Sequence, residues 1–553
     1  MSVSFMRSEL SSMLLVYSII RDCIEGEPAI KGWLLSGTNI TQNPAGFNGG
    51  GANPVLSDTI LLRARRYLPM PNETDQSQKN KDRYRQYLQR AVWYNVTART
   101  LEGMVGQIFL IPPVIEVPSE LKPMLTDSDG DGLSFVQGAK KSVSDTMAYG
   151  RCGLYVDYPK TSGEVNKAQI SSGAIKPMIQ VIQPWNIYNW RTKKINGKTV
   201  LTMVVIREVS DNYDEDGYSV DQSEGYRVLK LDPSTGNYTI EVYEPADARD
   251  GAVNSITDPM VAAALPSKAN VAYNQSDTIV PTDGAGKPFT YIPFTFVGSK
   301  NNDPAVDKPP LYDLASLNLA HYRNSADFEE SCHMVGQPTP WATGLDESWV
   351  HNVLHDSIPL GSRAGIPLPT GAQIGLMQAN ANQMPLEAMK AKEDEMFALG
   401  AKLVVQKRVQ RTATEAAVDA SSETSVLTNV ANNVSTAYEF AFKCAAQFVN
   451  ADASKIKVAL NTQFELNTLT PDEQSKVVAS WVQGAISFGE MRETLRKAGT
   501  ATLPDDQARA AIEKDRKDGL IPPAGGAKLA TNAPNPNNNP SGHADTAAAA
   551  GRP

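Results

Sequence analysis

The sequence predicts an α+β fold, because helical and strand patterns occupy separate stretches of the chain. Helical spacing of apolar residues dominates the chain up to Gly150, and strand-like alternation dominates from there to about Val297. From Pro310 onward the helical pattern returns and continues to about residue 516. Helices and strands grouped in separate runs are typical of an α+β architecture.

Three helices are expected before Gly150. The helical patterns cover residues 6–32, 81–104 and 134–149, and Gly150 closes the third at the position where glycine is favoured. A stretch rich in Gly, Asn and Pro at 35–57 is expected to be a loop.

The middle of the chain predicts a β-rich block. The expected strands are 153–158, 178–182, 199–207, 226–231, 238–243 and 294–297. A polar stretch at 249–288 interrupts them and is expected to be a long loop.

The C-terminal half predicts long helices separated by a segment that proline breaks. The expected helices are 311–332, 385–403 and 414–450, followed by two or three short helices within 471–516. Five prolines break residues 333–380, and the tail 521–553 has a disordered composition.

Composition excludes several classes of protein. The chain has 553 residues, 41% hydrophobic and 20% charged, which predicts a globular protein of two to four structural units. With 52 Lys+Arg against 61 Asp+Glu, its net charge of −9 argues against a protein that coats nucleic acid over its whole surface. Four dispersed cysteines disfavour a disulfide scaffold and a zinc ribbon.

No membrane segment or signal peptide is expected. The apolar run 13–20 is much shorter than the roughly 20 residues that a spanning helix needs, and Arg21 follows it at once.

Two clusters could hold a metal ion. Asp127, Asp129 and Asp131 alternate with Ser and Gly as in the first half of a calcium loop, but Gly138 replaces the final Glu. A turn that caps the helix starting near Ser134 explains the same residues. His351 and His355 are one helical turn apart, but Asn352 stands where a zinc hydrolase would carry its Glu.

The sequence offers no catalytic motif. The segment 284–288 fails as a phosphate loop, because prolines occupy the positions of its first glycine and its final Ser or Thr. No nucleophile elbow, Cys/His dyad or dinucleotide motif is present. We therefore expect neither an enzyme nor a cofactor.

A basic segment indicates contact with phosphates. Lys402, Lys407, Arg408 and Arg411 lie within ten residues and without an acidic residue among them, between two long helices. In a monomer this is an ordinary solvated loop. In a ring, the same charges would line a hole and attract DNA without reading its bases.

The chain resembles the portal proteins of tailed bacteriophages, and more narrowly a portal group long described only as a domain of unknown function. The resemblance spans roughly residues 10–470. The blocks that carry it are RAVWYNVTARTLEG (90–103), DGDG (129–132), GRCGLYVDYP (150–159), WNIYNWR (185–191), PPLYDLASLNLAHYRNSAD (309–327) and GQPTP (336–340). Their order and joint presence are specific, while the stretch 35–57 and the tail lie outside the match.

The resemblance implies the portal plan of wing, stem, clip, tunnel loop and crown. On this chain the plan places a wing at 1–310, stem helices at 311–332 and 385–403, and a clip at 333–384. It continues with a tunnel loop at 404–420, a long helix returning to the wing at 421–470, a helical crown at 471–520 and a disordered tail at 521–553.

It also implies function and partners. Portals form rings, usually of twelve copies, at one capsid vertex, where double-stranded DNA is packaged and ejected. The implied partners are further copies of the chain, DNA of any sequence, the terminase large subunit, head–tail adaptors, and the major capsid and scaffolding proteins. The implied location is the virion, at the junction of head and tail, and the host cytoplasm during assembly.

The plan assigns roles to individual residues. Lys402, Lys407, Arg408 and Arg411 would face DNA on the tunnel loop, and Lys390 and Lys392 are candidates for lining the channel at the stem. Clip candidates for docking terminase and adaptors are Trp341, Trp349, His351 and His355.

Two other classes stay open. Another oligomeric virion protein, such as a head–tail adaptor or internal head protein, would not need an insertion between paired helices. A metal-dependent hydrolase would require the acidic turn or the histidine pair to bind metal tightly.

Overall fold

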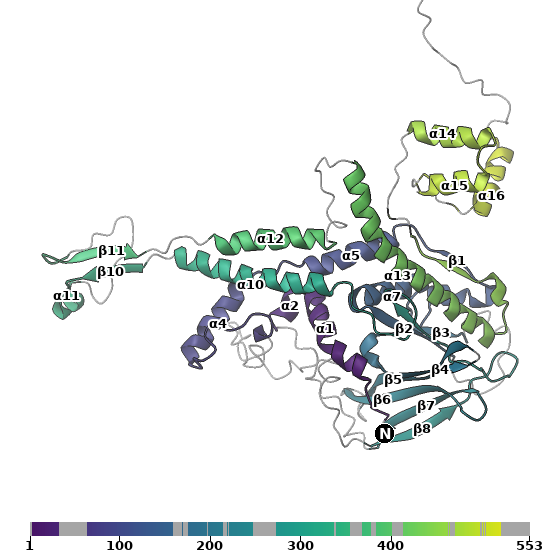
Figure 1. The fold of residues 1–553 in the computed structure, drawn as a ribbon, viewed down its shortest axis with the longest axis horizontal. Coiled ribbons are helices and arrows are strands. Elements are labelled where there is room, and N and C mark those ends of the chain that lie inside the picture. Colours follow the sequence, from purple (N-terminus) through teal and green to yellow (C-terminus); the bar gives the residue numbers. More distant parts are fainter. Residues whose placement is uncertain are drawn as a thin grey trace, which may run out of the picture. The chain divides into compact units, whose positions relative to one another are not determined.

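The protein is represented by a computed structural model that describes most of the chain. The described residues are 3–32, 64–158, 169, 175–195, 197–213, 218, 220–246, 272–336, 339–353, 368–377, 383–400, 413–462, 464, 471–497, 500–501, 503 and 505–520. They belong to two compact units, Met1–Phe464 and Glu465–Pro553. All described strands lie in the first unit, which is a mixed α+β structure (Figure 1).

The N-terminal helix is shorter than the sequence predicts. Instead of one helix over 6–32, the structure has α1 (Ser8–Glu25) and α2 (Glu27–Ile30), which meet at Gly26. Gly26 has φ +85 and ψ −151, a backbone conformation that glycine adopts without strain and that other residues rarely adopt.

The helix predicted over 81–104 is also two helices, α4 (Gln78–Arg90) and α5 (Val96–Ile108). The side chain of Asn95 accepts a hydrogen bond from the backbone N–H of Ala98, which caps the start of α5. The apolar spacing continues across the break, so periodicity alone does not reveal it.

The longer helices described in the rest of the first unit follow the prediction closely, namely α7 (Phe135–Tyr149), α10 (Tyr312–Val335), α12 (Met384–Ala398) and α13 (Ala413–Phe448). The short helices α6 (Pro123–Thr126) and α11 (Glu347–Asn352) were not predicted. Short 3-10 turns lie at Ser119–Leu121, Pro184–Asn186 and Ala453–Lys455. The end of α12 comes five residues before the predicted position 403, at a C-cap on Leu399.

A three-stranded antiparallel sheet lies at the centre of the core, in the order β3–β2–β9. Its strands are β3 (Met178–Ile182), β2 (Arg151–Asp157) and β9 (Phe294–Gly298). The first six residues of β2 are buried, because α7 and α13 pack against this sheet.

A five-stranded antiparallel meander adjoins this core in the order β4–β5–β6–β7–β8. Its strands are β4 (Ile187–Ile195), β5 (Lys198–Tyr213), β6 (Val220–Leu231), β7 (Tyr238–Pro245) and β8 (Tyr273–Ile279). The prediction of a loop over 249–288 is wrong at β8. This edge strand is mostly polar and exposed, so it lacks the alternation that identifies a half-buried strand.

The long helix α13 closes the core from the C-terminal side. Tyr438 packs edge-to-face on Phe135, with 5.0 Å between ring centroids, and its hydroxyl lies 3.2 Å from Ser142 Oγ. The strand after α13, β12 (Lys457–Ala459), pairs with β1 (Val114–Glu116), which ties this end of the first unit to its N-terminal part.

The second unit contains the short helices predicted for 471–516. They are α14 (Pro471–Val482), α15 (Phe488–Lys497) and α16 (Asp505–Lys517). Trp481 and Phe488 pack with 5.8 Å between ring centroids, and Met491 is buried. The expected loop at 35–57 and the expected tail at 521–553 lie outside the described residues.

The structure bears on the expectations about disulfides and about membrane-spanning helices. All four cysteines are free thiols, three of them buried, with Cys332 exposed. Within the described ranges, no helix is both long enough and apolar enough to cross a bilayer.

Candidate functional site

The candidate site is built on α10, whose first half lies inside the protein. Asn318 is fully buried there, and both polar atoms of its side chain are satisfied. Its Oδ1 accepts hydrogen bonds from the backbone N–H and the hydroxyl of Thr97, at 3.2 and 2.9 Å, while its Nδ2 donates to the Tyr94 carbonyl at 2.8 Å. The amide therefore fixes α10 to the start of α5.

Helix α4 packs against the second half of α10 and is joined to it by side-chain contacts. The Tyr87 hydroxyl donates to Asp327 at 2.6 Å, and Arg90 forms an ion pair with Glu330. On the same side of α10, Arg323 Nε donates to the Tyr67 carbonyl at 2.9 Å.

Helix α12 runs alongside α10 (Figure 1). The buried ring of His321 on α10 lies with Nε2 3.2 Å from Glu393 Oε1 on α12, and Met396 is buried in the same helix. The two helices pack side by side and are connected by the segment that contains β10 (Thr339–Thr343), α11 and β11 (Gln373–Met377), so they form a long hairpin with that segment at its tip.

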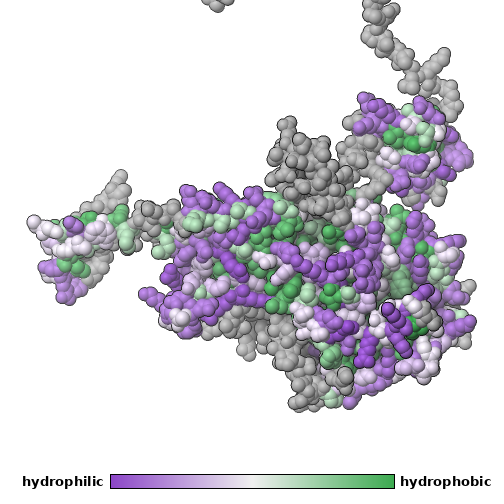
Figure 2. All heavy atoms as spheres, in the orientation of Figure 1, coloured by the Kyte–Doolittle hydropathy of each residue, from purple (hydrophilic) through white to green (hydrophobic). Residues whose placement is uncertain are grey.

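The predicted channel candidates lie on α12. Lys390 is exposed and Lys392 is half-buried. The exposed side of the helix otherwise carries the acidic residues Glu387, Asp394 and Glu395, and Figure 2 shows a predominantly hydrophilic surface along α12.

The segment at the tip of the hairpin contains a small two-stranded sheet, β10 (Thr339–Thr343) with β11 (Gln373–Met377), and helix α11. The predicted clip residue Trp341 lies opposite Gly375 in the antiparallel register. Its indole occupies the space beside the glycine: a Cβ added at Gly375 would lie 2.8 Å from three of its ring atoms.

This insertion exposes apolar side chains on both faces of its sheet. The exposed fractions are 41% for Trp341, 38% for Ile374, 61% for Leu376 and 65% for Met377. Since Ile374 and Leu376 alternate with Gly375 and Met377 along β11, neither face of the ribbon is buried within the described chain.

The other clip candidates lie on or after α11. Asp346 caps this helix by accepting a hydrogen bond from the Trp349 N–H at 2.8 Å; Trp349 is half-buried and His351 is exposed. His355 lies outside the described residues, so the predicted histidine pair cannot be compared with the structure.

The acidic turn is held together by its own carboxylates. Asp127 Oδ1 accepts from the N–H groups of Gly130 and Gly132, at 2.9 and 3.0 Å, and its other oxygen is paired with Lys176. The Lys176 ammonium group is the largest cause of the lowered pKa of Asp127, followed by these backbone hydrogen bonds.

The second carboxylate of the turn, Asp129, likewise accepts from the N–H groups of Asp131 and Leu133. The expectation that the turn caps the following helix is wrong in detail. Ser134 is the N-cap of α7 and forms a capping box with Gln137. Among the described residues, no three His, Cys, Asp or Glu side chains are arranged to hold a metal ion.

The basic segment of the sequence prediction cannot be compared with the structure, since Lys402, Lys407, Arg408 and Arg411 lie outside the described residues. Chain order still fixes its place, directly between the end of α12 and the start of α13.

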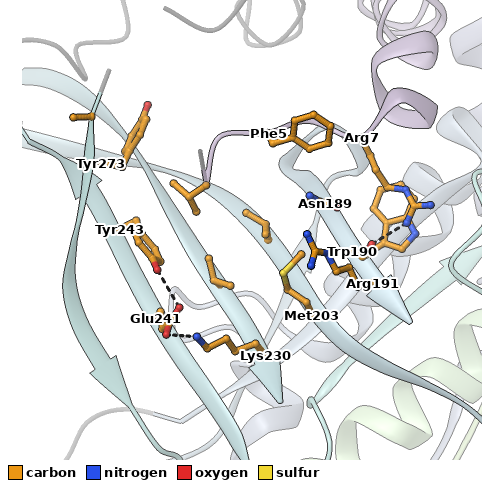
Figure 3. Close-up of a pocket in the computed structure, with 14 residues that line it drawn as sticks. Phe5, Arg7, Asn189, Trp190, Arg191, Met203, Lys230, Glu241, Tyr243 and Tyr273 are labelled. Atoms are coloured by element: carbon orange, nitrogen blue, oxygen red, sulfur yellow. Dashed lines mark hydrogen bonds and ion pairs between the residues drawn. The ribbon is translucent and has the colours of Figure 1, made fainter. Parts of the chain in front are cut away.

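Sequence reasoning missed a groove on the five-stranded sheet. It has a volume of about 810 Å³ and lies between the N-terminal segment and strands β4–β8 (Figure 3). Among the residues that line it, Arg7 stacks over the Trp190 ring at 4.6 Å, and Lys230 forms an ion pair with Glu241. The separation of these residues in the chain explains why no local pattern predicts the groove.

One protein family matches part of the chain. A family described as "Domain of unknown function (DUF4055)" matches residues 310–449, the part from α10 through α13, and no curated protein matches.

Two solved structures contain similar chains. In "Virion of native gene transfer agent (GTA) particle", a chain with 12% identity and a TM-score of 0.38 matches over 74% of this chain and 92% of its own length. In "Neck of empty GTA particle computed with C6 symmetry", the values are 11%, 0.36, 76% and 93%. TM-scores below 0.5 do not establish a shared fold.

Proposed function

We propose that this chain is the portal protein of a tailed bacteriophage. It assembles into a ring at one vertex of the capsid, usually twelve copies in this family, and double-stranded DNA passes through the ring during packaging and ejection. The protein guides DNA and organises partners, and it catalyses no reaction.

The observation that carries the proposal is the hairpin of α10 and α12 with a small β-structured insertion at its tip. A two-helix stem bearing a clip, followed by a loop and a long helix, is the order of parts that the sequence resemblance implies. Here α10, the β10–α11–β11 segment, α12, the basic segment and α13 follow one another in that order.

The hydrogen bonds that join α10 to the start of α5 support the same proposal. Asn318 belongs to one of the resembling blocks, 309–327, while Tyr94 and Thr97 belong to another, 90–103. The blocks meet where the stem helix is fixed to the body, so their residue types serve the placement of the stem.

The charges favour passage of DNA over tight binding. A chain of net charge −9 attracts phosphates only weakly as a whole, while Lys402, Lys407, Arg408 and Arg411 would form a thin basic belt at the tunnel loop. Lys390 and Lys392 would add positive charge to the stem wall. DNA slides through a channel that attracts it only weakly.

The exposed ribbon of the clip supplies the docking surface for successive partners. Trp341, Leu376 and Met377 offer apolar contact area, with Trp349 and His351 beside them on α11. The proposed partners are the terminase large subunit during packaging and head–tail adaptors afterwards, while the body contacts capsid and scaffolding proteins. These partners place the protein in the virion, after assembly in the host cytoplasm.

The first test is the mass of the purified protein by native mass spectrometry, together with particle images. A closed ring with a central hole is expected, near about 720 kDa for twelve chains of 59.9 kDa. A chain that stays monomeric at high concentration and in the presence of scaffolding protein would contradict the proposal. Stoichiometric metal by elemental analysis would instead favour a hydrolase.

A further inference from the structure

The side of α12 that points away from α10 carries three exposed acidic residues and one exposed lysine, Lys390, so it is acidic on balance. Glu387, Asp394 and Glu395 are exposed there and form no ion pair within the described part of the chain. They lie roughly 100–200° around the helix from Glu393, the residue that contacts α10. We call these three residues the acidic stem face.

The opposite side of the hairpin is basic. Helix α4 carries five basic residues and one acidic residue, namely Lys79, Lys81, Arg83, Arg85 and Arg90 against Asp82. Lys79 and Arg83 are exposed on it, Arg83 by 69% and with its guanidinium 3.8 Å from Glu330. Arg323 of α10 is exposed on the same side, as is Asp327, which accepts the Tyr87 hydrogen bond. We call Lys79, Arg83 and Arg323 the basic stem face.

Helical geometry shows that the two faces point in opposite directions. His321 contacts α12 and Glu330 contacts α4, and the step of nine positions from one to the other corresponds to about 180° around α10. Helix α10 therefore lies between α12 and α4, as Figure 1 also shows.

Exposed methionines accompany the charges on both sides. Met384 on α12 is 75% exposed and precedes Glu393 by nine residues, so it lies on the outward side. Met334 on α10 is 56% exposed and lies one turn beyond Glu330, on the side of α4. Both are near the tip of the hairpin, where they offer apolar contact area.

We propose that the acidic stem face of one copy docks on the basic stem face of the next copy. This inference rests on the ring proposed above and names the surfaces that build it. Two unlike faces pointing in opposite directions form a head-to-tail contact, which can close into a ring. A symmetric dimer through either face would bring like charges together, which is unfavourable.

Two charge-reversed proteins test the contact. The first carries Glu387→Lys, Asp394→Lys and Glu395→Lys, and the second carries Lys79→Glu and Arg83→Glu. Each protein alone should lose at least about 90% of its ring in native mass spectrometry, because like charges meet at every contact. The matched control, Lys193→Glu with Lys194→Glu on exposed positions of β4, should keep the wild-type mass.

Mixing the two reversed proteins separates a lost contact from a lost fold. In an alternating ring, the reversed face of the first protein meets the reversed face of the second, and the unchanged faces also meet. The equimolar mixture should therefore recover mixed rings with an even number of copies. A misfolded protein could not be rescued in this way.

The outcomes distinguish this contact from the ring itself. If the wild type forms a ring and either reversed protein also does, the contact is wrong while the portal proposal stands. If the reversed proteins fail to form rings and the mixture is not rescued, the contact is also wrong. A wild type that forms no ring under any condition overturns both.

Discussion

Asn318 and Thr97 are joined by two hydrogen bonds although 221 positions separate them in the chain. The pair is buried, so water cannot replace either bond when one partner is lost. This contact fixes the orientation of α10, the helix that leads into the β10–α11–β11 segment.

Asn318→Ala should destabilise the protein, because it leaves the Thr97 groups and the Tyr94 carbonyl without their partner. We expect a loss of about 2–4 kcal/mol of the free energy of unfolding, since each unsatisfied buried group costs roughly 1–3 kcal/mol. Denaturant titration measures it. The control is Ser316→Ala, at an exposed position of the same helix, which should change little. Equal midpoints for the two variants would contradict the prediction.

Gly150→Ala should be more harmful than an alanine at another left-handed glycine. Gly150 has φ +81, and a Cβ there would lie 2.7 Å from the Asp307 carbonyl oxygen. Gly236 has φ +73 with nothing within 4 Å, so Gly236→Ala measures the backbone strain alone, about 1–2 kcal/mol. We expect the Tm of the Gly150 variant to be lower than that of the Gly236 variant, and an equal Tm would show that the backbone at Asp307 gives way.

Asp145 should make stability depend on pH. Burial raises the pKa of its carboxyl to about 7, and Oδ2 has no hydrogen-bond partner. The unfolded chain loses this proton near pH 4 and the folded protein retains it to about 7, so stability falls as pH rises through that window and then levels off.

Asp145→Asn replaces the titrating carboxyl with an amide that carries no charge at either pH. The variant should therefore have a Tm a few degrees higher than wild type at pH 8 and an unchanged Tm near pH 4. Thermal melts at fixed protein concentration across this range measure the effect. Asp131→Asn, in the exposed turn, serves as the control and should show the wild-type pH dependence. A parallel pH profile for wild type and the Asp145 variant would refute the prediction.

Replacing Lys407, Arg408 and Arg411 with Ala should leave the mass of the ring unchanged but reduce the length or the retention of packaged DNA, because the proposed belt loses three charges per copy. Packaged length is read from DNA extracted from virions. Lys193→Ala with Lys194→Ala removes exposed charge elsewhere and should package normally. Full-length, stably retained DNA in the triple variant would remove the belt from the mechanism.

Sequence periodicity predicts the long helices and strands. It fails where tertiary contacts determine the end of a helix or the formation of a strand. The buried stripes of α10 and α13 are long enough to be recognised, and Gly150 ends α7 as expected. Gly26 interrupts an apolar pattern that continues beyond it, and β8 is stabilised by pairing with β7 while its own residues are polar.

The candidate site shows the same division. The sequence analysis named Trp341 and Trp349, but it did not name Ile374, Leu376 or Met377, whose exposure only the structure shows. The contact of Trp341 with Gly375 likewise depends on strand register. The two stem faces were not predicted either. Whether the charges of α4 and α12 point apart depends on how both helices pack on α10, which composition cannot reveal.

The β10–β11 ribbon has a consequence for the timing of assembly. Two strands without a buried face are only marginally stable in water, so their shape is easily changed by whatever binds them. A partner must then spend part of its interaction energy on ordering the ribbon, which lowers affinity and shortens residence time. For the portal proposed here, a surface that releases one occupant readily would suit terminase and adaptors that bind in succession.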